Sequence, residues 1–336
     1  MLRFYEISDA FTKFGVASVT IVNTFFIFLT VFHVKRIVGT YKKMVLIFAI
    51  SGIIFSSWEL IARPFVHNFN KGWIFFSLNK WLGVSKKLLQ LALIIYASFY
   101  LFMVVFIAVQ FLFRYYTLVN PRIAKKFTGK GIYLWMTYSL LSGVIYGGML
   151  FLFGGPDDYS DEYMREEILQ TYGSAVKELP RIQMIPYAAD GSLRIGNVLF
   201  IVIGSIDMTI QYSIIIYCDI RMHLVMKKEI DKSSIPNKKL QKQFFRALIV
   251  QTIVPTVLFV FPAAVVLMNP LLDIEMSFQT GWIYAFLSLY PPIDTIAFMI
   301  LVSEYRKVIK ELYKVIFPDK PNRSSETELS STVGKI

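Results

Sequence analysis

Three acidic residues, Glu59, Asp207 and Asp294, lie within long apolar stretches of this 336-residue chain. A charged side chain is costly in such surroundings, so each residue predicts a polar contact with a function. We expect Asp207 to contact a ligand or to link helices, and a protonated aspartic acid bonded to a neighbour is the alternative. Glu59 precedes Arg63 by four residues, which predicts an ion pair at the edge of the apolar stretch, with ligand contact as the alternative.

The residue patterns of enzymes and metal proteins are missing. His33, His67 and His223 are widely separated, and the single cysteine, Cys218, excludes an internal disulfide. Intramembrane hydrolases need metal-binding clusters, paired aspartates or a nucleophile beside a base. The sequence shows none of these at useful spacing, so we expect no catalytic activity, no metal and no cofactor.

Prolines interrupt two of the apolar stretches. Pro255 lies in one of them, and Pro291 and Pro292 follow Tyr290 and precede Asp294 in the other. Proline removes a backbone donor and kinks a helix, which frees carbonyl groups for a nearby acid or water. The pattern predicts hinges at these positions, although kinked helices also occur in rigid membrane proteins.

The composition indicates which elements hold these residues. The chain is 55% hydrophobic and 17% charged, whereas soluble domains are about 45–50% apolar and about 25% charged. Runs of roughly 20 apolar residues are long enough to cross about 30 Å of hydrocarbon as helices. The runs are continuous rather than alternating, which excludes a β-barrel and predicts an all-α bundle embedded in the lipid bilayer. The predicted spans are residues 15–34, 44–61, 88–111, 132–153, 195–217, 247–268 and 281–302.

Charge predicts the orientation of this bundle. Lysine and arginine number 24 in the segments on one side of the predicted membrane and 11 on the other. The basic side is cytoplasmic by the positive-inside rule, which places residues 1–14 outside and the C-terminus inside. This topology accounts for the net charge of +12, so no nucleic-acid partner is expected. Residues 62–87 oppose the rule with five basic residues and no acid; their Trp73 and Trp81 suit anchors at the headgroup level.

Two segments outside the spans show helical periodicity. Residues 154–194 predict a short amphipathic helix with Ser160 as its N-cap, which either covers the bundle mouth or rests on lipid headgroups. Residues 303–317 predict an amphipathic helix lying on an anionic inner leaflet. Residues 318–336 are polar and are expected to be a disordered cytoplasmic tail.

Several motifs, taken in order, resemble those of a known family. They are Phe-Leu-Phe-Arg-Tyr-Tyr at 111–116, Gly-Gly-Pro at 154–156 with an acidic run after it, Gln-Thr-Ile-Val-Pro at 251–255, and Tyr-Pro-Pro-Ile-Asp at 290–294. Over residues 10–317 the chain resembles the nematode Str family of seven-transmembrane chemoreceptors, which contains the diacetyl odorant receptor. The resemblance implies a G-protein-coupled receptor in the plasma membrane of sensory neurons, in their cilia, that detects a small odorant and signals to a heterotrimeric G protein.

The resemblance also implies roles for residues at the cytoplasmic side. Arg114 matches the arginine with which rhodopsin-like receptors switch between inactive and transducer-bound states. The chain departs from that pattern because Phe113, rather than an acid, precedes Arg114, and because Pro291-Pro292 stands where Asn-Pro is usual. The residues expected in activation and coupling are Arg114, Tyr115, Pro255, Tyr290, Pro291 and Asp294.

We expect the ligand site in the outer half of the bundle, since small-molecule pockets are concave, apolar and carry few polar groups. The candidate lining residues are Trp58, Glu59, Gln90, Ile94, Tyr96, Ile203, Asp207, Phe261, Trp282 and Phe286. A seven-span ligand-gated cation channel is the main alternative, although no helix shows the polar stripe of a pore. A scaffold that traffics partner receptors is a weaker one, and the oligomeric state is not predicted.

Overall fold

The computed structural model describes residues 4–35, 37, 39–79, 83–229, 246, 249–250, 252–254, 256–261, 264, 268–270, 278–279 and 282–317. These residues include five helices that are long and apolar enough to cross a membrane, and a sixth candidate if α10 and α11 form one bent span. Much of the predicted span 247–268, including Pro255, lies outside them, as do Trp81 and the predicted tail 318–336. The chain is thus a mostly helical membrane protein.

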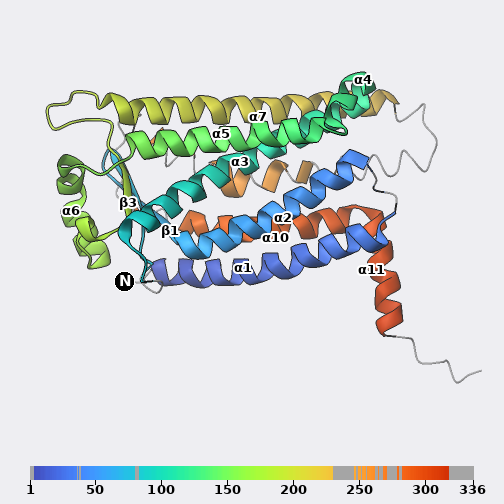
Figure 1. Ribbon diagram of the computed structural model, residues 1–336, viewed down its shortest axis with the longest axis horizontal. Coiled ribbons are helices and arrows are strands. Elements are labelled where there is room, and N and C mark those ends of the chain that lie inside the picture. The colour runs from blue at the N-terminus through green and yellow to red at the C-terminus, as the bar shows by residue number, and fades with distance from the viewer. Residues whose placement is uncertain are drawn as a thin grey trace, which may run out of the picture.

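Long helices run alongside one another and form the bundle (Figure 1). Helix α3 is central, because it packs against α2, α5 and α7 and 67% of its most apolar stretch is buried, compared with 22% for α5 and α7. A Cβ atom at Gly143 of α5 would lie only 2.5 Å from the backbone oxygen of Ser98, so this glycine permits the close contact with α3. The bundle helices are α1 (Phe4–Phe28), continued by the π-helical turn η1 (Leu29–His33), α2 (Gly39–Ala62), α3 (Lys86–Val119), α5 (Gly131–Phe153), α7 (Ile195–Glu229) and α10 (Trp282–Leu301).

A small β-sheet covers one end of the bundle, and we name this sheet together with α6 the cap. The strands are β1 (Pro64–Phe69), β2 (Gly72–Ser77), β3 (Arg181–Met184) and β4 (Phe278–Gln279), arranged antiparallel in the order β3-β2-β1-β4. Asn70, with φ of +46°, makes the turn between β1 and β2. The expected all-α fold is therefore corrected by this four-stranded sheet.

Both faces of the sheet are buried. Val66, Trp73 and Phe75 pack against the bundle, whereas Phe65 and Ile74 pack against α6 (Asp158–Tyr172). The amphipathic helix predicted in the 154–194 segment therefore covers the sheet, and the sheet covers the bundle mouth, rather than the helix resting on headgroups. Trp73 is 3% exposed, so its side chain packs inside the protein rather than against lipid headgroups.

The predicted N-cap residue of helix α6 is wrong. Asp157, not Ser160, is the N-cap residue, and its carboxylate accepts a hydrogen bond from the backbone N–H of Ser160 at 2.7 Å. The Ser160 hydroxyl in turn lies 3.0 Å from the backbone nitrogen of Asp157 and completes a capping box. Aspartate and serine both favour the N-cap position. The sequence pattern therefore did not distinguish Asp157 from Ser160, which lies in the first turn of the helix.

The opposite end of the bundle carries short elements, and we name it the α11 end. Helix α11 leaves α10 at an angle of 88°, and it projects away from the bundle (Figure 1). Tyr305 is its buried anchor. The remaining elements described are α4 (Pro121–Ala124), η2 (Lys125–Phe127), η3 (Val176–Glu178), η4 (Thr256–Val260) and α11 (Ser303–Ile316).

Candidate functional site

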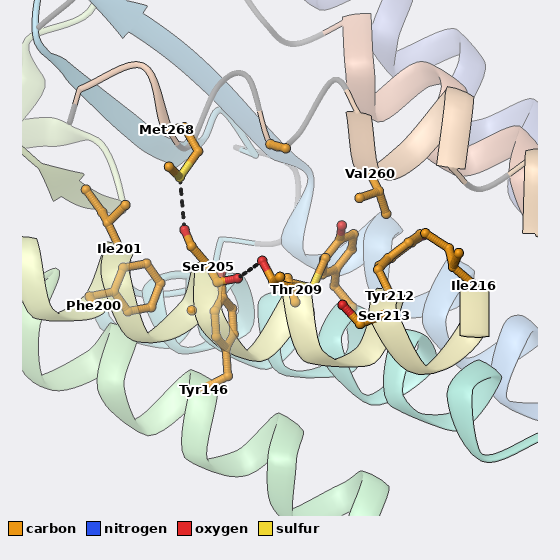
Figure 2. A pocket seen from close by; sticks show the side chains of 14 residues that line it. Tyr146, Phe200, Ile201, Ser205, Thr209, Tyr212, Ser213, Ile216, Val260 and Met268 are labelled. Atoms are coloured by element: carbon orange, nitrogen blue, oxygen red, sulfur yellow. Dashed lines mark hydrogen bonds between the residues drawn. The ribbon is translucent and has the colours of Figure 1, made fainter. Parts of the chain in front are cut away.

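A pocket of about 420 Å³ opens between α7, α5, α3 and the segment after residue 256. Helix α7 supplies most of its wall, and α5 and α3 contribute Tyr146 and Tyr100. Figure 2 shows lining side chains along α7, with Met268 and Val260 on the facing side. The lining residues are Tyr100, Tyr146, Phe200, Ile201, Gly204, Ser205, Met208, Thr209, Tyr212, Ser213, Ile216, Val260, Ala264 and Met268.

The pocket surface combines aromatic rings, thioethers and hydroxyl groups. The Ser205 hydroxyl donates to the Met268 sulfur at 3.1 Å, and the Thr209 hydroxyl donates to the Ser205 carbonyl at 2.7 Å (Figure 2). The rings of Tyr146 and Phe200 lie 5.1 Å apart. Among the lining residues that the structure describes, none is an acid, a lysine, an arginine or a histidine. Such a surface suits an uncharged molecule with few polar groups.

None of the ten residues predicted to line a ligand site lines this pocket. Some of them join helices instead: Trp58 donates to the carbonyl of Ala92 at 2.9 Å, and the Tyr96 ring stacks on Phe55 at 4.8 Å. Both contacts tie α2 to α3. Of the others, Ile94 is buried and Gln90 is half-buried, while Ile203 and Phe261 are exposed. The side chains of Trp282 and Phe286 lie outside the described part of the chain.

Asp207 takes part in a link between helices. Its carboxylate accepts from the side-chain amide of Gln211 at 3.1 Å, and the same amide nitrogen lies 3.2 Å from the Tyr138 hydroxyl of α5. Gln211 is 1% exposed. Asp207 therefore lies at a contact between helices, as the second expectation has it, and does not line the pocket.

Glu59 does not pair with Arg63 as expected. Its carboxyl oxygen Oε1 accepts from the Thr12 hydroxyl of α1 at 2.9 Å and from the Ser288 hydroxyl of α10, and the side chain is fully buried. Arg63 instead contacts Asp9 of α1. The i,i+4 spacing suggested a local pair, but burial of α2 between α1 and α10 gave both residues partners on other helices.

Arg114 and Tyr115 face different neighbours at the α11 end. The guanidinium carbon of Arg114 lies 3.2 Å from the centroid of the Tyr41 ring on α2. Tyr115 is 9% exposed, and its ring is 5.9 Å from that of Tyr217 on α7. Phe113 packs on Phe127 at 5.7 Å. Three consecutive residues of α3 thus contact three different elements.

The remaining residues predicted for activation lie along α10. The helix continues through Pro291 and Pro292, and Tyr290, Pro291 and Asp294 are buried. One residue further on, Thr295 donates to the side-chain oxygen of Asn23 at 2.7 Å. Asn23 of α1 donates to the carbonyl of Ala49 in α2 at 2.9 Å. The Asp294 segment therefore lies where α1, α2 and α10 are joined by polar contacts.

The comparisons with known proteins identify the family. Residues 8–310 match the family described as "Serpentine type 7TM GPCR chemoreceptor Str". The chain belongs to this Str family. It is 38% identical over 315 residues to the G-protein coupled receptor str-33 of Caenorhabditis elegans, which covers 92% of this chain and 91% of that relative. It is 23% identical over 275 residues to the serpentine receptor class r-10 of the same organism, covering 81% and 80% of the two chains.

The fold of this Str receptor is rhodopsin-like. Squid rhodopsin superposes with a TM-score of 0.61 at 12% identity, covering 99% of this chain and 92% of that one. The chain is thus a seven-transmembrane G-protein-coupled chemoreceptor rather than an enzyme. The predicted resemblance and receptor class are confirmed.

Sequence reasoning missed the pocket residues of this Str receptor and the partner of Arg114. Ser205, Thr209 and Ser213 recur at i, i+4 and i+8 on α7, which is the spacing of one helix face. This hydroxyl stripe was a signal for the pocket wall. For Tyr41 there was no such signal, since it lies 73 positions before Arg114 in sequence.

Proposed function

We propose that the ligand of this chemoreceptor is a small uncharged molecule, of the size of an odorant, that binds in the pocket beside α7. The cap faces the exterior, as the positive-inside rule favours, and the α11 end faces a heterotrimeric G protein in the cytoplasm. Such a receptor would act in the plasma membrane of a sensory cell, in its cilium.

The volume and the lining residues of the pocket support this proposal. A volume of about 420 Å³ lies within the range of small-molecule sites, about 300–1,000 Å³. The apolar rings and the Met208 and Met268 thioethers can enclose a hydrocarbon skeleton, while the hydroxyl oxygens of Ser205 and Thr209 can accept a hydrogen bond from an alcohol. A charged ligand would lose its hydration without gaining a counter-charge from the described lining residues.

Charge at the α11 end supports coupling there. Arg122, Lys125 and Lys126 are exposed in α4 and η2, and the α11 helix carries further lysines and an arginine. Such a surface favours an acidic or apolar helix end of a G protein. Arg114 lies at the same end of α3, within reach of a partner that enters between the helices.

The pocket is tested with a ligand panel and paired variants. Cells that do not normally respond would express the chain with a calcium reporter, first to find a ligand and then to compare Ser205→Leu with Ser142→Leu. Ser205→Leu fills the pocket and removes a hydroxyl, so the effective ligand concentration should rise at least tenfold. Ser142 lies on α5 outside the lining, so its variant should respond as the parent does. Equal responses of Ser205→Leu and the parent would remove this pocket from the proposal.

The coupling step is tested by Arg114→Ala. The variant should reach the cell surface but lose ligand-driven nucleotide exchange on an added G protein, because the cationic group at the coupling end is gone. Arg165→Ala, a change at an exposed arginine of the cap, serves as the matched control and should retain exchange. A ligand-driven current through purified protein in vesicles, without any G protein, would favour the channel alternative instead.

A further inference from the structure

The contact between Arg114 and Tyr41 joins the coupling end of α3 to the first turn of α2. The guanidinium carbon is 3.2 Å from the ring centroid, a distance at which a cation is attracted by the negative face of an aromatic ring. Tyr41 is 9% exposed and its ring lies 6.3 Å from that of Phe298 on α10. The ring is therefore fixed between Arg114 and the last turns of α10.

The residues on either side of Arg114 in the sequence are uncharged and cannot form an ion pair with it. Phe113 precedes it and packs into the aromatic cluster around Phe127, and Tyr115 faces α7. A cationic side chain at a helix surface needs a partner once it is removed from water. In this structure the partner from α2 is a ring, which can bind a cation without a formal charge of its own.

Phe298 connects this contact to α10, the helix in which hinges are predicted. Its ring lies 6.3 Å from the Tyr41 ring, one turn after the buried Asp294. Movement of α10 relative to α2 would therefore change the surroundings of Tyr41 and, through its ring, the position of Arg114. The contact between Arg114 and Tyr41 can transmit ligand binding only if it differs between the inactive and the active state of the receptor.

We propose that Tyr41 is a positioning residue that holds Arg114 against α2 in the silent state of the receptor and releases it on activation. The proposal rests on the proposed role of Arg114 in G-protein coupling. The silent state is stabilised by the cation on the ring, so weakening the ring should increase the active population in the absence of ligand. A partly desolvated contact of this type corresponds to about a 5- to 30-fold change in such an equilibrium.

The first experiment replaces the ring. Purified receptor in lipid would be assayed for ligand-free nucleotide exchange on an added G protein, comparing Tyr41→Met with Tyr133→Met. Methionine fills much of the same space without an aromatic face, so basal exchange should rise about 5- to 30-fold for Tyr41→Met. Tyr133 is 69% exposed on α5, and its variant should match the parent. Basal exchange of folded Tyr41→Met equal to that of the parent would overturn the proposal.

A second experiment avoids any change of shape. Tyr41 is replaced by phenylalanine and by phenylalanines that carry one, two or three fluorine atoms on the ring. Each fluorine weakens the negative face of the ring, while the packing is nearly unchanged. Basal exchange should rise with each fluorine relative to Tyr41→Phe. A flat series would refute the cation–ring contact as the restraint, even if Tyr41→Met failed to fold.

The two proposals fail in different ways. If Arg114→Ala retains ligand-driven exchange, the coupling role is wrong whatever Tyr41 does. If Arg114→Ala is silent and the fluorine series is flat, the coupling role holds and only the restraint by Tyr41 is wrong. A rise in the series that disappears in the Arg114→Ala background would support both.

Discussion

The cap and the α11 end both contain aromatic contacts, but the cap combines them with a buried ion pair. In the cap, Arg181 donates to both carboxylate oxygens of Asp161 at 2.7 and 2.6 Å, and the two side chains are 11% and 7% exposed. At the α11 end, the Phe26 ring stacks on Tyr305 at 5.2 Å and the Phe127 ring stacks on Trp135 at 4.6 Å. The cap also contains aromatic contacts, such as Phe76 with Tyr172 at 5.1 Å, so its buried ion pair comes in addition to aromatic packing.

The difference fits the proposed orientation, in which the cap is a fixed outer face and the α11 end is a mobile inner one. A bidentate ion pair is satisfied in one geometry, so it resists sliding. Aromatic rings can tilt and re-pack at a cost of about 0.5–1.5 kcal/mol for each pair. Since a disulfide cannot form with one cysteine, pairs such as Arg181–Asp161 supply the fixed connections of the cap.

The largest predicted effect is loss of the buried ion pair in the cap. Asp161→Ala leaves the Arg181 guanidinium without its bidentate partner and should destabilise the cap by about 3–5 kcal/mol. Thermal unfolding of purified receptor in lipid, with surface expression as a second readout, measures this loss.

A double variant separates the pair from general damage. Asp161→Leu with Arg181→Met removes both charges, so it should recover most of the loss, because apolar replacements of a buried pair are often neutral. Lys177→Ala disrupts an exposed pair with Asp158 and should leave unfolding unchanged. If Asp161→Ala unfolds as the parent does, the cap is not fixed by this pair.

Much of the bundle could be predicted because it depends on composition. Long apolar runs leave helices as the main solution in lipid. The motif around Arg114 indicated the family from the sequence alone. Helix rotation could not be predicted in the same way. On an all-apolar helix such as α3, periodicity does not distinguish the face toward a pocket from the face toward lipid. Tyr96 was therefore predicted to line the ligand site, whereas Tyr100 lines the pocket of the structure.

The cap illustrates a second limit. Residues 64–77 carry aromatic and β-branched runs on either side of Asn70-Lys71-Gly72, which is a hairpin pattern. The segment was interpreted as a basic loop between two spans with Trp73 and Trp81 as anchors, so the hairpin was not predicted. The partners of Glu59 and Arg63 show the same limit, since contacts such as Glu59 to Ser288 join residues 229 positions apart.

A smaller effect is predicted at the α11 end. The hydroxyl groups of Tyr305 and Thr30 lie 2.8 Å apart, and Tyr305 is fully buried. Tyr305→Phe removes this bond but keeps the ring stack, so it should cost about 1 kcal/mol of unfolding free energy. Tyr313→Phe, at an exposed tyrosine of the same helix, is the control. A loss as large as that of Asp161→Ala would show that the α11 end is as rigidly bonded as the cap.

The smallest predicted effect is a pH dependence that belongs to the cap alone. His67 of β1 is buried, with Glu167 at 3.0 Å and the Tyr172 hydroxyl at 3.1 Å, both from α6. Burial lowers the pKa of His67 below its ordinary value of 6.5, although the nearby Glu167 carboxylate opposes this shift. The folded cap therefore favours the neutral ring, so its stability is full above 6.5 and is lost as the pH falls through the lower folded pKa.

Hydrogen exchange of the β1 and β2 amides measures this dependence between about pH 7.5 and pH 5. Protection of the parent cap should decrease as the solution is acidified, and His67→Gln, which cannot titrate in this range, should show a shallower decrease. Amides of α5 serve as the internal reference, since this helix contains no histidine. Equal decreases in parent and variant would mean that another titrating group, and not His67, causes the loss of protection in the cap.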